Sequence, residues 1–291
     1  MINVCSRQAS LSNIVPEDSE LERLATGFQF TEGPVWNASE AYVLFSDIPD
    51  DHIYKWSPDM GVTVFREQSG NSNGLTYDEK GRLLICEHGN RRLSCIEMNG
   101  AYTVLVDKFN RKRLNSPNDV TVRSDGLIYF TDPPYGIKPE EQELSFQGVF
   151  RLNPTNGDVM LLVDDFDHPN GLAFSPDEKT LYIAETPRRH VRSFDVNPNG
   201  TLSNSRIFAE IHSKLPGNPD GMKADVEGNL YVAAAGGIWV FSEEGEHLGT
   251  IKTPETPSNC AWTGKDWKSL FITARTSILR IKLKIPGVKL S

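Results

Sequence analysis

The chain has 291 residues, of which 38% are hydrophobic and 24% are charged, and its formal net charge is −9. This is the composition of a globular protein, and it excludes an intrinsically disordered chain. The sequence has no basic stripe that could follow a phosphate backbone, which argues against a nucleic acid as partner.

The N-terminal residues and the cysteines indicate a cytoplasmic protein. Residues 1–13 contain no apolar segment of signal-peptide length. No apolar run approaches the roughly 20 residues that a membrane-spanning helix needs, so we expect no membrane association. Cys86 and Cys95 could face each other across a hairpin. Buried free thiols are nevertheless the favoured interpretation for a reducing compartment.

In chain order, six segments repeat one pattern: a polar residue, an apolar strand, a polar turn and a second apolar strand. They open near Glu32, Asn73, Asn118, Asn170, Asp220 and Asn259. A period of about 40–50 residues with several short strands in each unit is typical of β-propeller blades. No long segment has the 3.6-residue period of a helix. We therefore predict an all-β, six-bladed β-propeller that occupies residues 1–291 as a single domain.

The last repeat ends without an outer strand. After residues 278–283 only a short tail remains, whereas the N-terminal stretch Leu21 to Phe28 resembles the outer strands of earlier repeats. We predict that this stretch completes the last blade, because pairing the first and last strands closes the ring and removes an exposed edge. The alternative, a two-sheet sandwich, gives no reason for a polar residue to recur six times.

The six recurring polar residues should form a ring at one mouth of the central channel, because the first strand of each blade lines that channel. The loops between second and third strands return to the same face, and they carry Asp47, His88, Asp132, Tyr135, Glu185, Arg188, Arg189 and Arg275. A single Asn-Gly or Asp-Gly pair could be only a turn, so the recurrence carries the interpretation.

Two members of this ring, Glu32 and Asp220, are carboxylates, and the other four are amides. Buried carboxylates are costly unless they are paired or bind a metal. We therefore predict one divalent cation bound by oxygen atoms. Ca²⁺ is the first choice, and Zn²⁺, Mg²⁺ or Mn²⁺ are alternatives. Asn73 and Asn259 are the weaker candidates, since either could bind backbone groups or substrate instead.

Four stretches of the chain resemble the gluconolactonase family, which includes regucalcin, and more loosely diisopropyl fluorophosphatase. They are Glu32–Trp36, Leu114–Asp119, Pro169–Phe174 and Pro219–Met222. The similarity is closest to bacterial-type gluconolactonases, on residues 86–89, 131–136 and 168–171, whereas animal regucalcins have an Arg at the position of Ser116. The resemblance implies a propeller with one catalytic divalent cation. Its ligands would be Glu32, Asn118, Asn170 and Asp220.

The activity that the resemblance implies is hydrolysis of a sugar lactone. A bound cation can polarise the lactone carbonyl and stabilise the oxyanion that follows. We expect Asp220 to act as general base or nucleophile and Asn118 to orient the carbonyl. The expected substrate contacts are Asn73, His88, Asn115, Tyr135 and Asn259. Two alternatives stay open, a phosphotriesterase-like hydrolase at the same site and a non-catalytic calcium-binding propeller, because fold alone does not decide between them.

Overall fold

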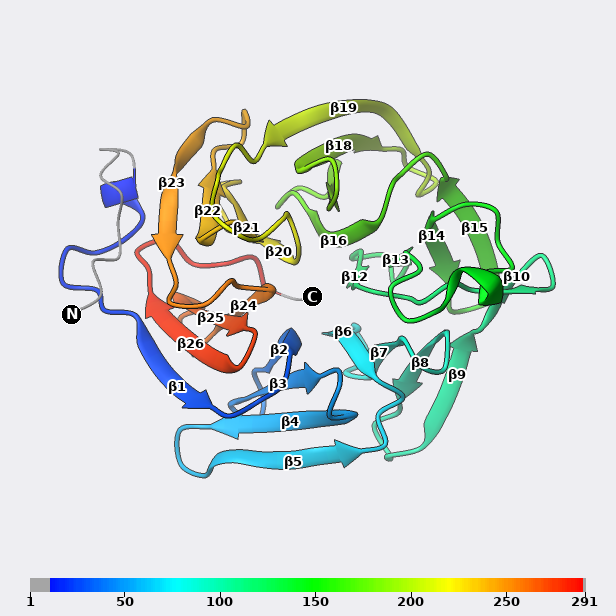
Figure 1. Cartoon of the computed structure of the whole chain (residues 1–291), viewed down its shortest axis with the longest axis horizontal. Coiled ribbons are helices and arrows are strands. Elements are labelled where there is room, and N and C mark those ends of the chain that lie inside the picture. Colours follow the sequence, from blue (N-terminus) through cyan, green and yellow to red (C-terminus); the bar gives the residue numbers. More distant parts are fainter. Residues whose placement is uncertain (1–10, 290–291) are drawn as a thin grey trace.

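The computed structural model describes residues 11–289 and contains six four-stranded antiparallel sheets arranged around a central axis (Figure 1). Blade 1 consists of β2 (Thr31–Asn37), β3 (Tyr42–Asp47), β4 (His52–Ser57) and β5 (Gly61–Glu67). Blade 2 consists of β6 (Ser72–Tyr77), β7 (Leu83–Glu87), β8 (Arg92–Ile96) and β9 (Tyr102–Val106). Blade 3 consists of β12 (Val120–Val122), β13 (Ile128–Asp132), β14 (Gly148–Asn153) and β15 (Asp158–Val163).

The second half of the ring repeats this organisation. Blade 4 consists of β16 (Pro169–Phe174), β17 (Thr180–Glu185), β18 (His190–Val196) and β19 (Leu202–Glu210). Blade 5 consists of β20 (Met222–Ala224), β21 (Leu230–Ala234), β22 (Gly237–Phe241) and β23 (His247–Lys252). Blade 6 joins β24 (Asn259–Thr263), β25 (Ser269–Ala274) and β26 (Ser277–Lys282) to β1 (Glu22–Thr26). The predicted six-bladed propeller is therefore confirmed.

The N-terminal strand β1 closes the ring, as predicted. It pairs antiparallel with β26, with Glu22 opposite Arg280 and Thr26 opposite Ser277. The Arg280 guanidinium lies 2.6 Å from the Glu22 carboxylate. Phe28, just beyond β1, packs its ring against Phe45 of blade 1 at a centroid distance of 5.1 Å. The closing strand thus links the last blade to the first.

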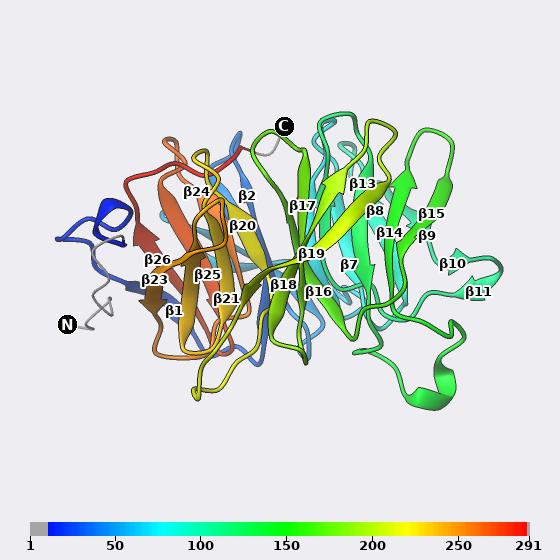
Figure 2. The same cartoon turned by 90° about the horizontal axis from the view of Figure 1, so that it is seen from above.

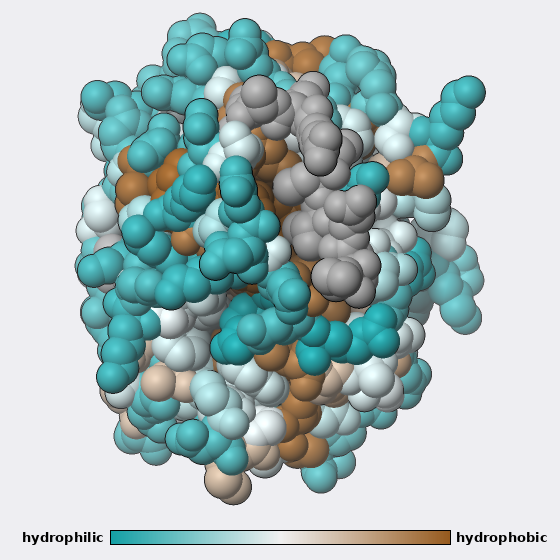
Figure 3. Space-filling model, turned by 90° about the vertical axis from the view of Figure 1, so that its left-hand side faces the viewer, coloured by the Kyte–Doolittle hydropathy of each residue, from teal (hydrophilic) through white to brown (hydrophobic). Residues whose placement is uncertain are grey.

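The core lies between neighbouring sheets. Tyr129 of blade 3, for example, meets Phe174 of blade 4 edge to face, with ring centroids 5.1 Å apart. The middle strands are covered on both faces, and every residue of β21 is buried. This explains why their sequences are almost continuously apolar instead of alternating. On the side that carries β1, β23 and β26, the surface is mostly hydrophilic, with interrupted strips of hydrophobic side chains (Figure 3).

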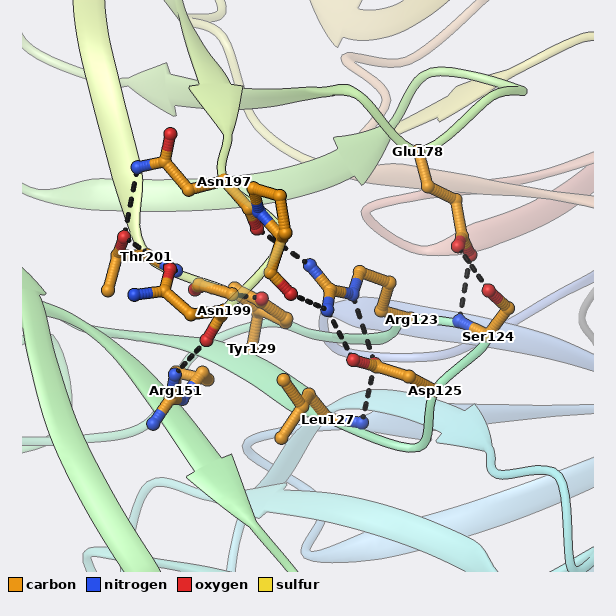
Figure 4. A network of polar contacts seen from close by, with 12 residues as sticks. Arg123, Ser124, Asp125, Leu127, Tyr129, Arg151, Glu178, Asn197, Asn199 and Thr201 are labelled. Atoms are coloured by element: carbon orange, nitrogen blue, oxygen red, sulfur yellow. Dashed lines mark hydrogen bonds and ion pairs between the residues drawn. The ribbon is translucent and has the colours of Figure 1, made fainter.

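Polar contacts also tie blades together on the face opposite the predicted ring. Figure 4 shows such a network between blades 3 and 4. Arg123 donates to the carbonyl oxygen of Asn197 at 3.3 Å, and the backbone N–H of Ser124 donates to Glu178 at 2.8 Å. Because these bonds join turns of different blades, they fix how the two sheets lie against each other.

Only short helical turns occur among residues 11–289, and none is long and apolar enough to cross a membrane. They are η1 (Leu11–Asn13) and η2 (Pro139–Glu141). A small hairpin, β10 (Lys108–Phe109) and β11 (Lys112–Arg113), projects from the rim, and the loop that carries η2 projects from one face (Figure 2). At the opposite face the C-terminal tail crosses the end of β20, where the Val288 N–H donates to the Ala224 oxygen at 3.2 Å.

Candidate active site

The six predicted polar residues lie at the start of the inner strands, on the face from which the η2 loop projects. Glu32, Asn73, Asn118, Asn170 and Asn259 are buried, and Asp220 is partly exposed. Backbone hydrogen bonds join the blades at this level. The Gly74 N–H donates to the Asn118 oxygen at 2.9 Å, and the Gly221 N–H donates to the Ser258 oxygen at 2.8 Å. The predicted ring is therefore present, and the main chain of neighbouring blades fixes it.

Glycine follows several ring residues because the blades approach each other too closely there for a side chain. A Cβ at Gly171 would lie 2.3 Å from the Asp220 oxygen, and a Cβ at Gly221 would lie 1.9 Å from Cγ of Asn259. Neither glycine has the positive φ of a turn. Asn170-Gly171 and Asp220-Gly221 are therefore not turn residues. Each glycine lacks a side chain where the ring residue of the next blade packs against it.

Hydroxyl side chains that the sequence interpretation missed complete this frame. They donate from one blade to a carbonyl oxygen of the next: Ser46 to Asn73 at 2.8 Å, Thr131 to Asn170 at 2.8 Å, Thr186 to Pro219 at 3.0 Å and Ser258 to Thr31 at 2.6 Å. In the sequence, the only signal for these contacts is a Ser or Thr close to the end of a strand on the ring face. Backbone groups and these hydroxyls therefore fix the position of the ring.

The two ring carboxylates have raised pKa values. Burial is the main cause for Glu32, and it raises the pKa from 4.5 to about 7 even though Glu32 accepts hydrogen bonds from the Gly33 N–H at 2.7 Å and from Asn259 at 3.1 Å. Burial, and then the charge of Glu32, raise the pKa of Asp220 well above 3.8. Two carboxylates that resist ionisation side by side call for a nearby cation.

A third carboxylate, Asp119, was not predicted as part of the site. It is buried, it accepts a hydrogen bond from the Val120 N–H at 2.9 Å, and the Asn259 amide lies 3.4 Å from its other oxygen. Its charge raises the pKa values of both Glu32 and Asp220. Lys223, in β20, counteracts this by lowering the pKa values of Glu32 and Asp119. When all are ionised, three carboxylates and one ammonium leave a net charge of about −2, which a divalent cation would balance.

The amides of the ring fit the same cation. The Asn170 nitrogen donates to the Thr186 hydroxyl at 3.2 Å, which leaves the amide oxygen for a ligand. The Asn118 side chain makes no hydrogen bond to any other residue within 11–289. No group of three His, Cys, Asp or Glu side chains suited to a metal occurs in that part of the chain. A site here must therefore combine carboxylate and amide oxygens, as hard cations prefer.

Three of the predicted substrate contacts, Asn73, His88 and Asn115, have different hydrogen-bond partners. The Asn73 amide donates to Nε2 of His88 at 3.1 Å, and burial lowers the pKa of His88 to about 4, so the imidazole is neutral. The Asn115 amide instead donates to the carbonyl oxygens of Asp132 and Phe146 at 3.0 and 2.9 Å. Asn115 thus supports the loop after β13, and its contact with a substrate stays a prediction.

Residues 30–276 match the protein family described as SMP-30/Gluconolactonase/LRE-like region. The chain belongs to this family. It is 34% identical to the gluconolactonase of Zymomonas mobilis over 95% of this chain and 85% of that protein. A solved gluconolactonase structure from Xanthomonas campestris is 36% identical, covers 97% of this chain and 94% of its own, and superposes with a TM-score of 0.89. Regucalcin of Xenopus laevis is 27% identical over 85% of this chain and 83% of its own.

In this family member, several loop carboxylates of the ring face support the scaffold. Asp47 accepts the backbone N–H groups of Gln29 and Phe30, both at 2.9 Å, and Asp132 accepts that of Asn115 at 2.7 Å. They fix connections between strands of the same face.

The cysteines also have structural positions. Cys86, Cys95 and Cys260 are free and buried, so the free-thiol interpretation is confirmed and a Cys86–Cys95 disulfide is wrong.

Proposed function

We propose that this protein is a metal-dependent lactonase that opens a sugar lactone with the help of one divalent cation, Ca²⁺ in the first place. One observation carries the proposal: the Asn259 amide lies 3.1 Å from Glu32 and 3.4 Å from Asp119, and the charges of both carboxylates raise the pKa of Asp220, in a chain whose relatives include gluconolactonases. Glu32, Asn118, Asn170 and Asp220 would hold the cation. The free, buried cysteines fit the reducing conditions of the cytoplasm.

The residues of the ring have separate tasks in this reaction. The cation, when bound, supplies Lewis-acid polarisation of the lactone carbonyl. Asp220 is the partly exposed carboxylate, so it can accept the proton of a water that attacks the carbonyl carbon, or attack that carbon itself. Asn118 orients the carbonyl with its amide nitrogen. In the water route, the proton passes to the leaving oxygen when the ring C–O bond breaks, and the hydroxy acid is released. In the nucleophilic route, ring opening leaves the acyl group bound to Asp220 as an anhydride, and the leaving oxygen takes a proton from water; a second water must then hydrolyse the anhydride to release the acid and regenerate Asp220.

The substrate would be held by the residues that surround the ring. Burial keeps His88 neutral and the Asn73 amide orients it, so the imidazole offers a fixed polar contact. Tyr135 and Asn259 contribute from blades 3 and 6, and Asn115 acts at the base of the loop. A small polyhydroxylated molecule, and not a polymer, fits these contacts around one channel mouth.

The test is acid release from glucono-1,5-lactone by metal-replete and by chelated protein, together with the Asp220→Asn variant. Asn keeps the shape and one oxygen ligand but cannot accept a proton. At saturating metal we expect kcat of Asp220→Asn to fall by roughly 10²–10⁴, the loss typical of a missing general base. The matched control is Asp59→Asn, since Asp59 is exposed in the turn between β4 and β5 on the other face.

The outcomes separate the candidate functions. Full recovery of kcat in Asp220→Asn at high metal concentration would remove Asp220 from the chemical step. If the metal-replete wild type hydrolyses no lactone but cleaves an organophosphate triester, the site is that of a phosphotriesterase. Metal binding without either activity would identify a calcium-binding propeller.

A further inference from the structure

The loop between β13 and β14, residues 133–147, is anchored at both ends beside the ring. At one end the Gly136 N–H donates to the Ser116 hydroxyl at 3.0 Å, and a Cβ at Gly136 would lie 2.4 Å from that oxygen. At the other end Asn115 holds the carbonyl of Phe146 at 2.9 Å. These contacts give Tyr135 a fixed base, although the loop projects from the face of the ring (Figure 2).

Tyr135 reaches from this loop toward the ring residues of blade 4. The residue is 42% exposed. Its hydroxyl nonetheless has Thr186 and Asn170 as hydrogen-bonding neighbours. The phenol is therefore a hydrogen-bonding group beside an expected metal ligand, while part of the residue stays open to solvent.

His168 stands next to Tyr135 and is held in place from three sides. The two rings are 5.0 Å apart and inclined by 46°. Nδ1 of His168 lies 2.6 Å from the Asp167 carboxylate, and the backbone N–H of His168 donates to the Gln147 side-chain oxygen at 2.7 Å. The Asp167 N–H in turn donates to the buried Glu185 at 2.8 Å. His168 also has a left-handed backbone, with φ of 54°.

The Nδ1–Asp167 contact directs the remaining ring nitrogen, Nε2, away from Asp167. The His168 side chain is 31% exposed, which leaves part of the imidazole accessible to a ligand.

We propose that Tyr135 and His168, with Asp167 as the positioning residue, form the wall that selects polyhydroxylated lactones over unsubstituted ones. This inference rests on the proposed lactonase function. The open aromatic face covers the C–H face of a sugar ring. The Tyr135 hydroxyl and Nε2 of His168 bind hydroxyl groups of the sugar. An unsubstituted lactone cannot form these hydrogen bonds, so it lacks the binding energy that they give to a sugar lactone.

The experiment compares kcat/KM for glucono-1,5-lactone and for δ-valerolactone, and the readout is their ratio. The variants are Tyr135→Phe, His168→Ala, Asp167→Ala and Asp167→Asn. We expect the first two to lower the ratio about tenfold each, the effect of one lost hydrogen bond, mainly through KM for the sugar lactone. Asp167→Ala should lower the ratio too, whereas Asp167→Asn keeps an acceptor oxygen and should restore most of it.

A matched control comes from the pair His212 and Glu210, which lie 3.2 Å apart on the surface with the His212 side chain 81% exposed. His212→Ala should leave the ratio unchanged. Ca²⁺ affinity measured by calorimetry should be the same in all variants, because the wall supplies no metal ligand.

The results distinguish this inference from the proposed function. If wild type hydrolyses both lactones and the ratio is unchanged in Tyr135→Phe and His168→Ala, the selecting wall is refuted. An equal loss on both lactones would refute it as well. If wild type hydrolyses neither lactone, the proposed function fails, and the inference that depends on it fails with it.

Discussion

Replacing Glu32 by Gln should stabilise the metal-free protein while it weakens metal binding. The pKa of Glu32 is raised from 4.5 to about 7 in the folded protein. The folded state therefore binds more protons than the unfolded chain between these pH values, and it loses stability as the pH rises through this window. At pH 8 the ionised carboxylate costs about 3 kcal/mol. Gln keeps the length and an acceptor oxygen for Gly33 and Asn259 but carries no charge.

The assay is urea unfolding of chelated wild type and Glu32→Gln at pH 5 and pH 8. We expect the variant to be more stable by about 3 kcal/mol at pH 8. At pH 5 the difference should be under about 1 kcal/mol, because Glu32 is then protonated in the folded wild type and carries no charge. Adding Ca²⁺ at pH 8 should reverse the order, because the variant lacks one of the two charges that face the ion. The exposed Glu79, changed to Gln, is the control. A variant that is no more stable than wild type at pH 8, or that binds Ca²⁺ equally well, would refute the reasoning.

Three further predictions concern the frame of the ring. Deleting residues 1–28 removes β1 and exposes the edge of β26, so the thermal midpoint should fall and the protein should aggregate; an unchanged midpoint would contradict this. Lys223→Met removes the ammonium group that lowers the pKa values of Glu32 and Asp119. Calorimetry should therefore show tighter Ca²⁺ binding, and thermal melting at pH 8 should show a less stable metal-free protein. Gly171→Ala forces a methyl group against the Asp220 backbone and should destabilise the protein by about 1–3 kcal/mol in urea unfolding, with no such loss expected if the blades can separate.

The architecture could be predicted from the sequence because its signals are local and repeated. Each blade begins with a polar residue and an apolar strand, and six repeats fix the number of blades. The missing outer strand after Leu283 and the apolar stretch from Leu21 to Phe28 were enough to predict the closure that β1 makes with β26. Such signals depend only on the order of residues along the chain.

The remaining parts of the site depend on contacts between blades, which order along the chain does not reveal. Asp119 follows Asn118 where four other blades have glycine, and the sequence alone gives no distance from it to Asn259 of blade 6. Lys223 lies in a strand whose neighbours are apolar, where a lysine suggests a solvent-facing position. Thr186 contributes only a hydroxyl group. Their roles follow from the angle at which neighbouring sheets meet, and the sequence contains no local record of that angle.

The frame and the charges of the ring have opposite energetic effects. Backbone bonds such as that from Gly74 to Asn118, and hydroxyls such as Thr186, satisfy the main chain without using the ring side chains. Three carboxylates can then lie near one another, although burial, and after it their mutual repulsion, raise the pKa values of Glu32 and Asp220. A scaffold that needed only stability would gain by replacing them with neutral side chains. Their presence fits the proposed cation, and the same unfavourable charge that destabilises the ring would then be the source of its affinity for that ion.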